Sequence, residues 1–214
     1  MGELQGYLDL VDWRRRVGDL YRVGVAEGLG EFRRGRDRLF RTHPQSPIPA
    51  DTRDSFQGLR YFEGDPAYRI ACRLEARAGE DLEIDTGGED GVVRYRRAGR
   101  LAFDLVGTAV ALTVFSLVGY GGGLFLPFRD ATSAKQTYGG GRYLLDTAKG
   151  ADLGGDGETL RLDFNFAYHP SCHYDPQWVC PLAPPANRLA VAIEAGELTY
   201  PGASAHELQW CAPS

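Results

Sequence analysis

Residues 105–128 read LVGTAVALTVFSLVGYGGGLFLPF and contain no charged side chain. A run of this length is long enough for a transmembrane helix, which needs about 20 apolar residues. Its composition favours another structure, because Val, Thr and Phe prefer strands and the glycine triplet at 121–123 interrupts the run. We therefore expect two buried strands joined by a glycine turn and no membrane-spanning segment.

Alternating side chains on both sides of this run predict further strands. Tyr68, Ile70 and Cys72 alternate with arginines, and Leu160 and Leu162 alternate with polar residues in the same way. The expected strands are 59–63, 68–77, 92–97, 101–106, 109–118, 124–128, 142–146, 160–168 and 189–193. About nine strands joined by short glycine-rich turns predict a mainly β fold, an antiparallel β-sandwich or barrel.

The first third of the chain has a helical pattern instead. Trp13, Val17 and Tyr21 recur at helical spacing, glycines at 28 and 30 interrupt the pattern, and three prolines between 44 and 49 prevent its continuation. We expect a single domain over 1–214, with a helical N-terminal segment at 1–50 and a β core at 56–200.

Charge and composition limit the partners to be expected. The net charge of -5 argues against non-specific nucleic-acid binding, which requires clustered positive charge. The N-terminal sequence MGELQGYLDLVDWRRR has no apolar segment of the kind that signal peptides carry. We therefore expect a cytoplasmic protein with reduced cysteines, bound neither to a membrane nor to nucleic acid.

The stretch HPSCHYDPQWVC, residues 169–180, holds two histidines and two cysteines. Zinc held by His169, Cys172 and Cys180 is one interpretation, although known zinc patterns use two close pairs of ligands and Cys180 has no close partner. A Cys172–Cys180 disulfide is a second interpretation. We favour a third, in which the cysteines are small buried side chains in a rigid proline-rich loop.

Polar residues near a strand end indicate a ligand pocket. Asp163 and Asn165 share one face of their strand, and Tyr168 follows at its end, while Arg142 and Tyr143 open a neighbouring strand. The simpler alternative is a face exposed to solvent. In a barrel or curved sandwich, however, such groups often surround the mouth of a ligand site.

The pocket hypothesis assigns a role to each residue. Arg142 would bind the charge of a small polar or anionic molecule, Asp163 and Asn165 would orient it by hydrogen bonds, and Tyr143 and Tyr168 would form an aromatic wall. If the pocket is catalytic, Asp163 would be the general base, for instance of a hydrolytic step.

Several blocks of the sequence resemble a known family. They are FRTHPQSPIP, FQGLRYFEGDPAYR, GYGGGLFLPFRDATSAKQTYGGGRYLLDTAKGADLGG, LDFNFAYHPSCHYDPQWVCPLAPPANRL and IEAGE. Together, from about Trp13 to Glu197, they resemble the bacterial and archaeal family 1684 of the domains of unknown function. That family has no established activity to carry over, so the resemblance by itself assigns none.

The resemblance does mark signature positions. They are Phe128, Asp130, Thr132, Tyr138, Gly141, Arg142, Tyr143, Asp163, Asn165, Tyr168, Pro170, Cys172, Tyr174, Cys180, Pro181 and Asn187. So many Asp, Arg, Asn and Tyr residues exceed what packing requires, which favours a functional site. His173 departs from the pattern, which usually has a small residue such as Ala there, and this weakens the metal interpretation.

Two other classes of function stay open beside the pocket. One is a protein-interaction module without catalysis, which would use the basic helical face around Arg33 and Arg34 or the aromatic loop around Trp178. The other is a zinc protein that uses the 169–180 loop.

Overall fold

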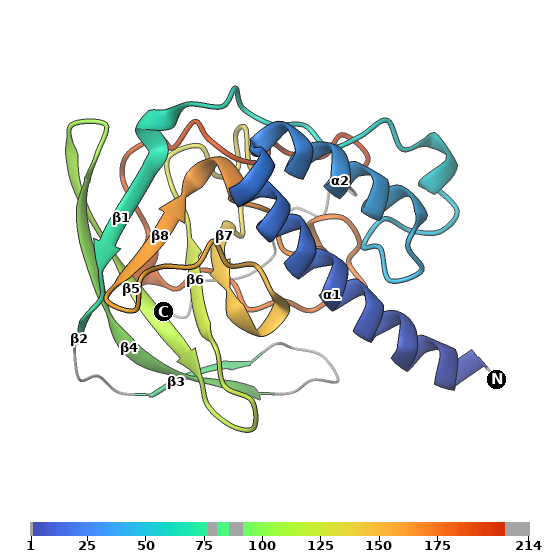
Figure 1. Cartoon of the computed structure of the whole chain (residues 1–214), viewed down its shortest axis with the longest axis horizontal. Coiled ribbons are helices and arrows are strands. Elements are labelled where there is room, and N and C mark those ends of the chain that lie inside the picture. Colours follow the sequence, from blue (N-terminus) through green and yellow to red (C-terminus); the bar gives the residue numbers. More distant parts are fainter. Residues whose placement is uncertain (1, 77–80, 86–91, 204–214) are drawn as a thin grey trace.

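The uncharged run at 105–128 forms an antiparallel pair of strands (Figure 1). In the computed structural model, which describes residues 2–76, 81–85 and 92–203, β5 (Thr108–Leu117) pairs with β6 (Leu124–Phe128). The glycines at 121–123 take the positive φ angles that the turn requires. No helix in the described part of the chain is both long and apolar enough to span a bilayer.

The β structure consists of a six-stranded antiparallel sheet and a two-stranded antiparallel ribbon (Figure 1). The sheet has the order β2-β4-β5-β6-β7, and β3 also pairs with β4. Its other strands are β2 (Glu75–Ala76), β3 (Asp81–Asp85), β4 (Val92–Leu105) and β7 (Arg142–Asp146), and the ribbon pairs β1 (Arg69–Arg73) with β8 (Thr159–Asp163). The mainly antiparallel fold is confirmed, but the pairing does not close into a barrel.

The expected strands differ from the observed ones at several points. Within the segment expected at 68–77, two strands form, β1 and β2, and β3 was not expected. The segments 92–97 and 101–106 are one strand, β4, which continues through an irregularity in pairing between Arg97 and Gly99. The segments 59–63 and 189–193 form no strand, because each meets its neighbours only through isolated bridges and single hydrogen bonds. Alternating side chains indicate one buried face, but a strand also needs a neighbour along its length.

The predicted strand at 160–168 ends early. β8 stops at Asp163, whose side chain accepts a hydrogen bond from the backbone N–H of Asn165 and begins a short 3-10 turn, η4 (Phe164–Phe166). The other short 3-10 turns are η1 (Arg53–Ser55), η2 (Pro66–Tyr68), η3 (Thr147–Lys149), η5 (Ser171–His173) and η6 (Pro185–Asn187).

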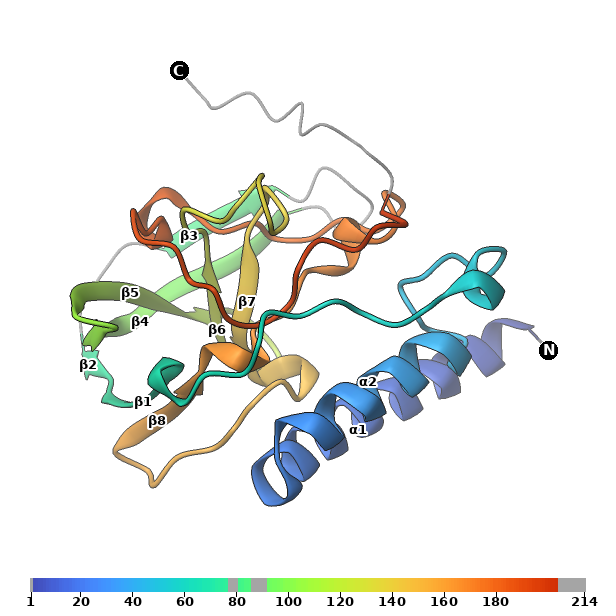
Figure 2. The same ribbon diagram turned by 90° about the horizontal axis from the view of Figure 1, so that it is seen from above.

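The predicted N-terminal helices are confirmed. α1 (Gly2–Glu27) and α2 (Leu29–Thr42) form a hairpin that lies alongside the β structure (Figure 2). Tyr21 and Phe32 pack with Phe166 of η4 in a shared apolar cluster. Gly24 is required for this contact, because a Cβ there would lie 2.5 Å from the Phe166 ring.

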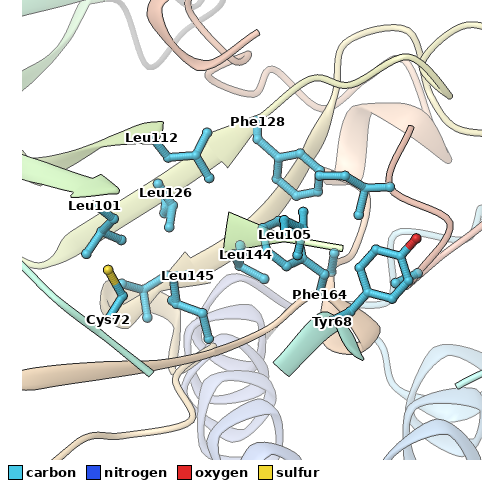
Figure 3. Packing of buried hydrophobic residues seen from close by; sticks show 14 of the residues in the cluster. Tyr68, Cys72, Leu101, Leu105, Leu112, Leu126, Phe128, Leu144, Leu145 and Phe164 are labelled. Carbon is cyan, nitrogen blue, oxygen red and sulfur yellow. The ribbon is translucent and has the colours of Figure 1, made fainter. Parts of the chain in front are cut away.

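The main core lies between the sheet and the ribbon (Figure 3). Leu101, Leu112 and Leu126 from the sheet pack in the same cluster as Cys72 of β1 and Leu162 of β8. Cys72 is therefore a core residue, as its place on the apolar face of the strand predicts.

The beginning of α1 extends beyond the rest of the molecule (Figures 1 and 2). Its first three turns expose Leu4, Tyr7, Leu8 and Val11, with exposed fractions of 68%, 62%, 57% and 46%. Their spacing puts all four on one face, which we call the α1 stripe.

Candidate functional site

A cleft lies between the tip of the helical hairpin and the β1–β8 ribbon. It encloses about 390 Å³. The helical side contributes Gly28 and Leu29, the ribbon contributes Arg69 and Arg161, and the lining also includes Phe166 of η4. Its volume falls within the range of roughly 300–1,000 Å³ that is usual for small-molecule sites.

The register of the ribbon brings charged side chains together at this cleft. Arg69 pairs with Asp163 and Ala71 with Arg161, and directly paired residues project on the same side of an antiparallel ribbon. Arg69, Arg161 and Asp163 therefore share one face, and all three line the cleft. Leu162 projects to the opposite side, into the main core.

Asp163, the predicted general base, has both carboxylate oxygens engaged. Its Oδ1 accepts from the backbone N–H of Asn165 at 2.9 Å and from the Asn165 Nδ2 at 2.6 Å, and its Oδ2 accepts from the Arg69 Nε at 3.1 Å. Asn165 in turn holds the backbone of Asp65 through two hydrogen bonds. Asp163 thus orients Arg69 and fixes the turn that ends β8.

Arg142, the predicted charge clamp, lies elsewhere. It is 1% exposed, and its guanidinium donates to the carbonyls of Ala195 and Ile193 and to Asp130. Burial lowers the pKa of Arg142, and the nearby Asp130 carboxylate opposes this effect. The structure does not bring Arg142 to the cleft, because every residue of β7 is buried and its side chains serve the interior.

Tyr143 and Tyr168, the predicted aromatic wall, contact each other but do not line the cleft. Their rings are perpendicular with centroids 5.6 Å apart, and their backbones exchange two hydrogen bonds. The Tyr143 hydroxyl donates to the Pro181 carbonyl at 2.6 Å. Burial raises the pKa of both phenols well above the ordinary value.

A buried polar network around Glu197 was not foreseen from the sequence. The Glu197 Oε1 accepts from the Arg36 Nε at 2.6 Å, and its Oε2 accepts from the Tyr174 hydroxyl at 2.6 Å and from the backbone N–H of His169 at 2.8 Å. Burial opposes the charged carboxylate. The Arg36 guanidinium and the contacts from His169 and Tyr174 outweigh burial and hold the pKa of Glu197 well below its usual range.

One signal in the sequence could have revealed this network. Phe32, Arg36 and Phe40 follow one another at i, i+4 spacing, which puts a charged residue on the buried face of α2. A buried arginine requires a buried partner. The sequence does not show that this partner is Glu197.

The structure does not bring the three predicted metal ligands together around one point. The His169 Nε2 accepts the backbone N–H of Tyr138 at 3.2 Å, and its Nδ1 lies 3.4 Å from the Glu197 carboxylate. Cys172 and Cys180 contact each other instead, with the Cys172 backbone N–H 3.4 Å from the Cys180 Sγ. Within 2–76, 81–85 and 92–203, no three His, Cys, Asp or Glu side chains are arranged to hold a metal ion.

The residues of the interaction hypothesis lie in mixed surroundings. Arg34 is exposed and pairs with Glu31 within its own helix, whereas the Arg33 guanidinium lies 4.4 Å from the centre of the Tyr61 ring. Trp178 is 37% exposed. Only part of the basic helical face is therefore available to a partner.

Comparisons with known proteins agree with the architecture. The chain is 42% identical to an uncharacterized protein from gene locus rrnAC0354 of Haloarcula marismortui, whose solution NMR structure it matches with a TM-score of 0.56. The match covers 78% of this chain and 90% of that one. No curated protein matches the chain. The family model described as protein of unknown function (DUF1684) matches residues 54–198, and the chain therefore belongs to that family.

Proposed function

We propose that the protein binds a small anionic molecule in the cleft between the helical hairpin and the β1–β8 ribbon. The observation that carries the proposal is the pair of guanidinium groups that line one cleft from adjacent strands, Arg69 from β1 and Arg161 from β8. Arginine pairs of this kind bind carboxylate or phosphate groups through charge-assisted hydrogen bonds.

The two arginines differ in a way that suits binding. Asp163 accepts a hydrogen bond from the Arg69 Nε, which leaves the two terminal nitrogens of Arg69 outside this contact. The side chain of Arg161 is exposed and makes no hydrogen bond or ion pair with any other described residue, whereas its backbone N–H donates to the Gly154 carbonyl. One positive group is thus preorganised and the other is free to close on a ligand.

Apart from the two arginines and Asp163, the cleft lining is apolar, and this limits the class of ligand. Leu29, Leu153 and Phe166 face the same space as the two arginines. A ligand that matches this surface has an acidic group at one end and an apolar portion at the other. Since both oxygens of Asp163 accept hydrogen bonds within the protein, the geometry favours binding over the hydrolytic step considered for this residue.

A thermal-shift panel of small aromatic and aliphatic carboxylates and phosphate monoesters tests the proposal. We expect at least one probe to raise the Tm of the wild type. The rise should disappear in Arg161→Ala, and also in Ala71→Phe, which fills the cleft between the two arginines without changing the charge.

The matched control is Arg73→Ala. Arg73 lies on the same face of β1, but it pairs with Glu158 and does not line the cleft. Equal shifts in wild type, Arg161→Ala and Ala71→Phe would refute the proposal. Loss of the shift in Arg100→Ala alone would place the ligand in a second cavity of about 330 Å³, beside Arg97, Arg100 and Thr113.

A second candidate function, protein interaction, is favoured by the α1 stripe. We propose a second copy of the chain as the partner. Glu3 and Arg14 are exposed, three helical turns apart on the same border of the stripe. Antiparallel pairing of two stripes would place Glu3 of each copy near Arg14 of the other, in the self-complementary manner of a two-fold contact.

Sedimentation over a range of protein concentrations tests this pairing. We expect a wild-type dimer that Leu8→Glu dissociates and Arg14→Glu weakens, and the double variant Glu3→Arg/Arg14→Glu should recover association. A wild-type protein that stays monomeric at every concentration would refute this candidate and leave the cleft proposal untouched.

A further inference from the structure

Cys172 and Cys180 form a pair of thiols that do not line the cleft. Cys172 lies in η5, and Cys180 lies eight residues later in the following loop. The Cys172 backbone N–H donates to the Cys180 Sγ at 3.4 Å. Both are half-buried and free of any disulfide.

The ends of the loop that carries the thiols are fixed by buried contacts. Tyr174 and the backbone of His169 both bond to Glu197, close to Cys172 in the chain. On the other side, the carbonyl of Pro181, next to Cys180, accepts from the Tyr143 hydroxyl. The two sulfur atoms are therefore held together by the fold, which reduces the ordering that a bond between them would require.

The surroundings make the two thiols chemically unequal. The neighbouring Cys172 side chain and the Cys172 backbone N–H, which donates to the Cys180 Sγ at 3.4 Å, lower the pKa of Cys180 against the opposing effect of burial. The neighbouring Cys180 sulfur and burial raise the pKa of Cys172. Because the thiolate is the nucleophile in cysteine chemistry, Cys180 is the attacking group of the pair.

We propose that Cys172 and Cys180 are a redox-active dithiol that a hydroperoxide converts into a disulfide. The Cys180 thiolate attacks the peroxide and takes one oxygen as a sulfenic acid, and the other oxygen leaves as an alcohol, or as water when the peroxide is hydrogen peroxide. The Cys172 sulfur then attacks the Cys180 sulfur and forms the S–S bond, and the sulfenic oxygen leaves as water. The two thiols lose two electrons to the peroxide.

Hydrogen peroxide added to the reduced full-length protein tests the proposal. The chain has four cysteines, and we expect thiol titration to fall from four to two and to return to four with dithiothreitol. Peptide mapping should find the Cys172–Cys180 link. Cys72→Ser, a core cysteine outside the loop, is the matched control and should form the same disulfide.

Single variants separate the two roles. In Cys172→Ser the reaction should stop at a sulfenic acid on Cys180, which dimedone traps. Cys180→Ser should consume peroxide at least about tenfold more slowly than wild type, because no activated thiolate remains. Circular dichroism checks that both variants are folded. If Cys172→Ser is not folded, Cys172→Ala replaces it. A disulfide between any other pair, or equal peroxide consumption by wild type and Cys180→Ser, would overturn the proposal.

Discussion

The protein uses arginine in two contrasting ways, in the buried network and in the cleft. Arg36 and Arg142 are almost fully buried, the Arg36 Nε donates to Glu197, and both terminal nitrogens of Arg142 donate to protein oxygens. Arg69 and Arg161 lie on the exposed face of a two-stranded ribbon. The difference teaches that a cation surrounded by protein acceptors organises the interior, whereas one with unfilled hydrogen-bonding capacity can bind a ligand.

Removing the charge of Glu197 should have the largest effect on the free energy of unfolding among the variants that test this comparison. Glu197→Gln leaves Arg36 buried without a counter-charge, which costs about 3–5 kcal/mol. Urea unfolding measures the loss. The control is Glu194→Gln, because Glu194 is exposed three residues away and should change stability by less than about 0.5 kcal/mol. Similar losses in both variants would contradict the role assigned to the network.

His173, a buried histidine next to the Glu197 network, should make the free energy of unfolding depend on pH. Burial, with the nearby His169, lowers the pKa of His173 from 6.5 to about 3. The unfolded chain takes up a proton below pH 6.5 that the folded chain refuses until about pH 3. Stability is therefore complete above pH 6.5 and is lost as the pH falls through this window, by up to about 1.4 kcal/mol per unit.

The variant that checks this is His173→Gln. Urea midpoints measured between pH 6.5 and pH 4 should decline less steeply with acidification in the variant than in wild type. Parallel pH profiles for the two proteins would show that another group is responsible.

The arginines of the cleft should matter little to stability. Arg161→Ala removes an exposed side chain without a described partner and should change the free energy of unfolding by less than about 0.5 kcal/mol. Arg142→Ala, by contrast, strands the buried Asp130 carboxylate and should cost about 3 kcal/mol or more. Comparable losses in the two variants would erase the distinction between organising and binding arginines.

The smallest difference between wild type and variant is expected in the amount of bound metal. Both nitrogens of His169 already have protein partners, so the loop offers two thiols rather than a complete zinc site. Elemental analysis of untagged protein purified without chelator should find well under one zinc per chain, with no change in Cys180→Ser. Stoichiometric zinc that this variant loses would revive the metal interpretation.

The sequence predicts elements well where the signal is local. The glycine triplet at 121–123 separates two β-rich runs, and the hairpin β5–β6 follows from it. Successive side chains of a strand point to alternate faces. This alternation puts Cys72 in the core and Asp163 on the opposite face of the ribbon. Whether a distant segment pairs along a predicted strand could not be predicted this way. The strand expected at 189–193 does not form for this reason.

The candidate site was only partly foreseen. Asp163 was chosen from its strand pattern and does line the cleft, but Arg142 was grouped with it although the fold buries that arginine in the interior. Arg69 and Arg161 were overlooked, because in the sequence they look like ordinary solvent-facing residues of alternating strands. Only the packing of the helical hairpin against the ribbon turns that face into a cleft.

By itself, the sequence determined the N-terminal helices, the β5–β6 hairpin, the alternation of faces and the residues able to carry charge, because these depend on side chains a few positions apart. The tertiary structure decided which charge meets which. Arg36 and Glu197 are 161 residues apart, and Arg69 and Asp163 are 94 apart. No local pattern encodes such pairings, because the two residues meet only in the folded chain. There a charge that is removed from water needs the partner that the fold places beside it.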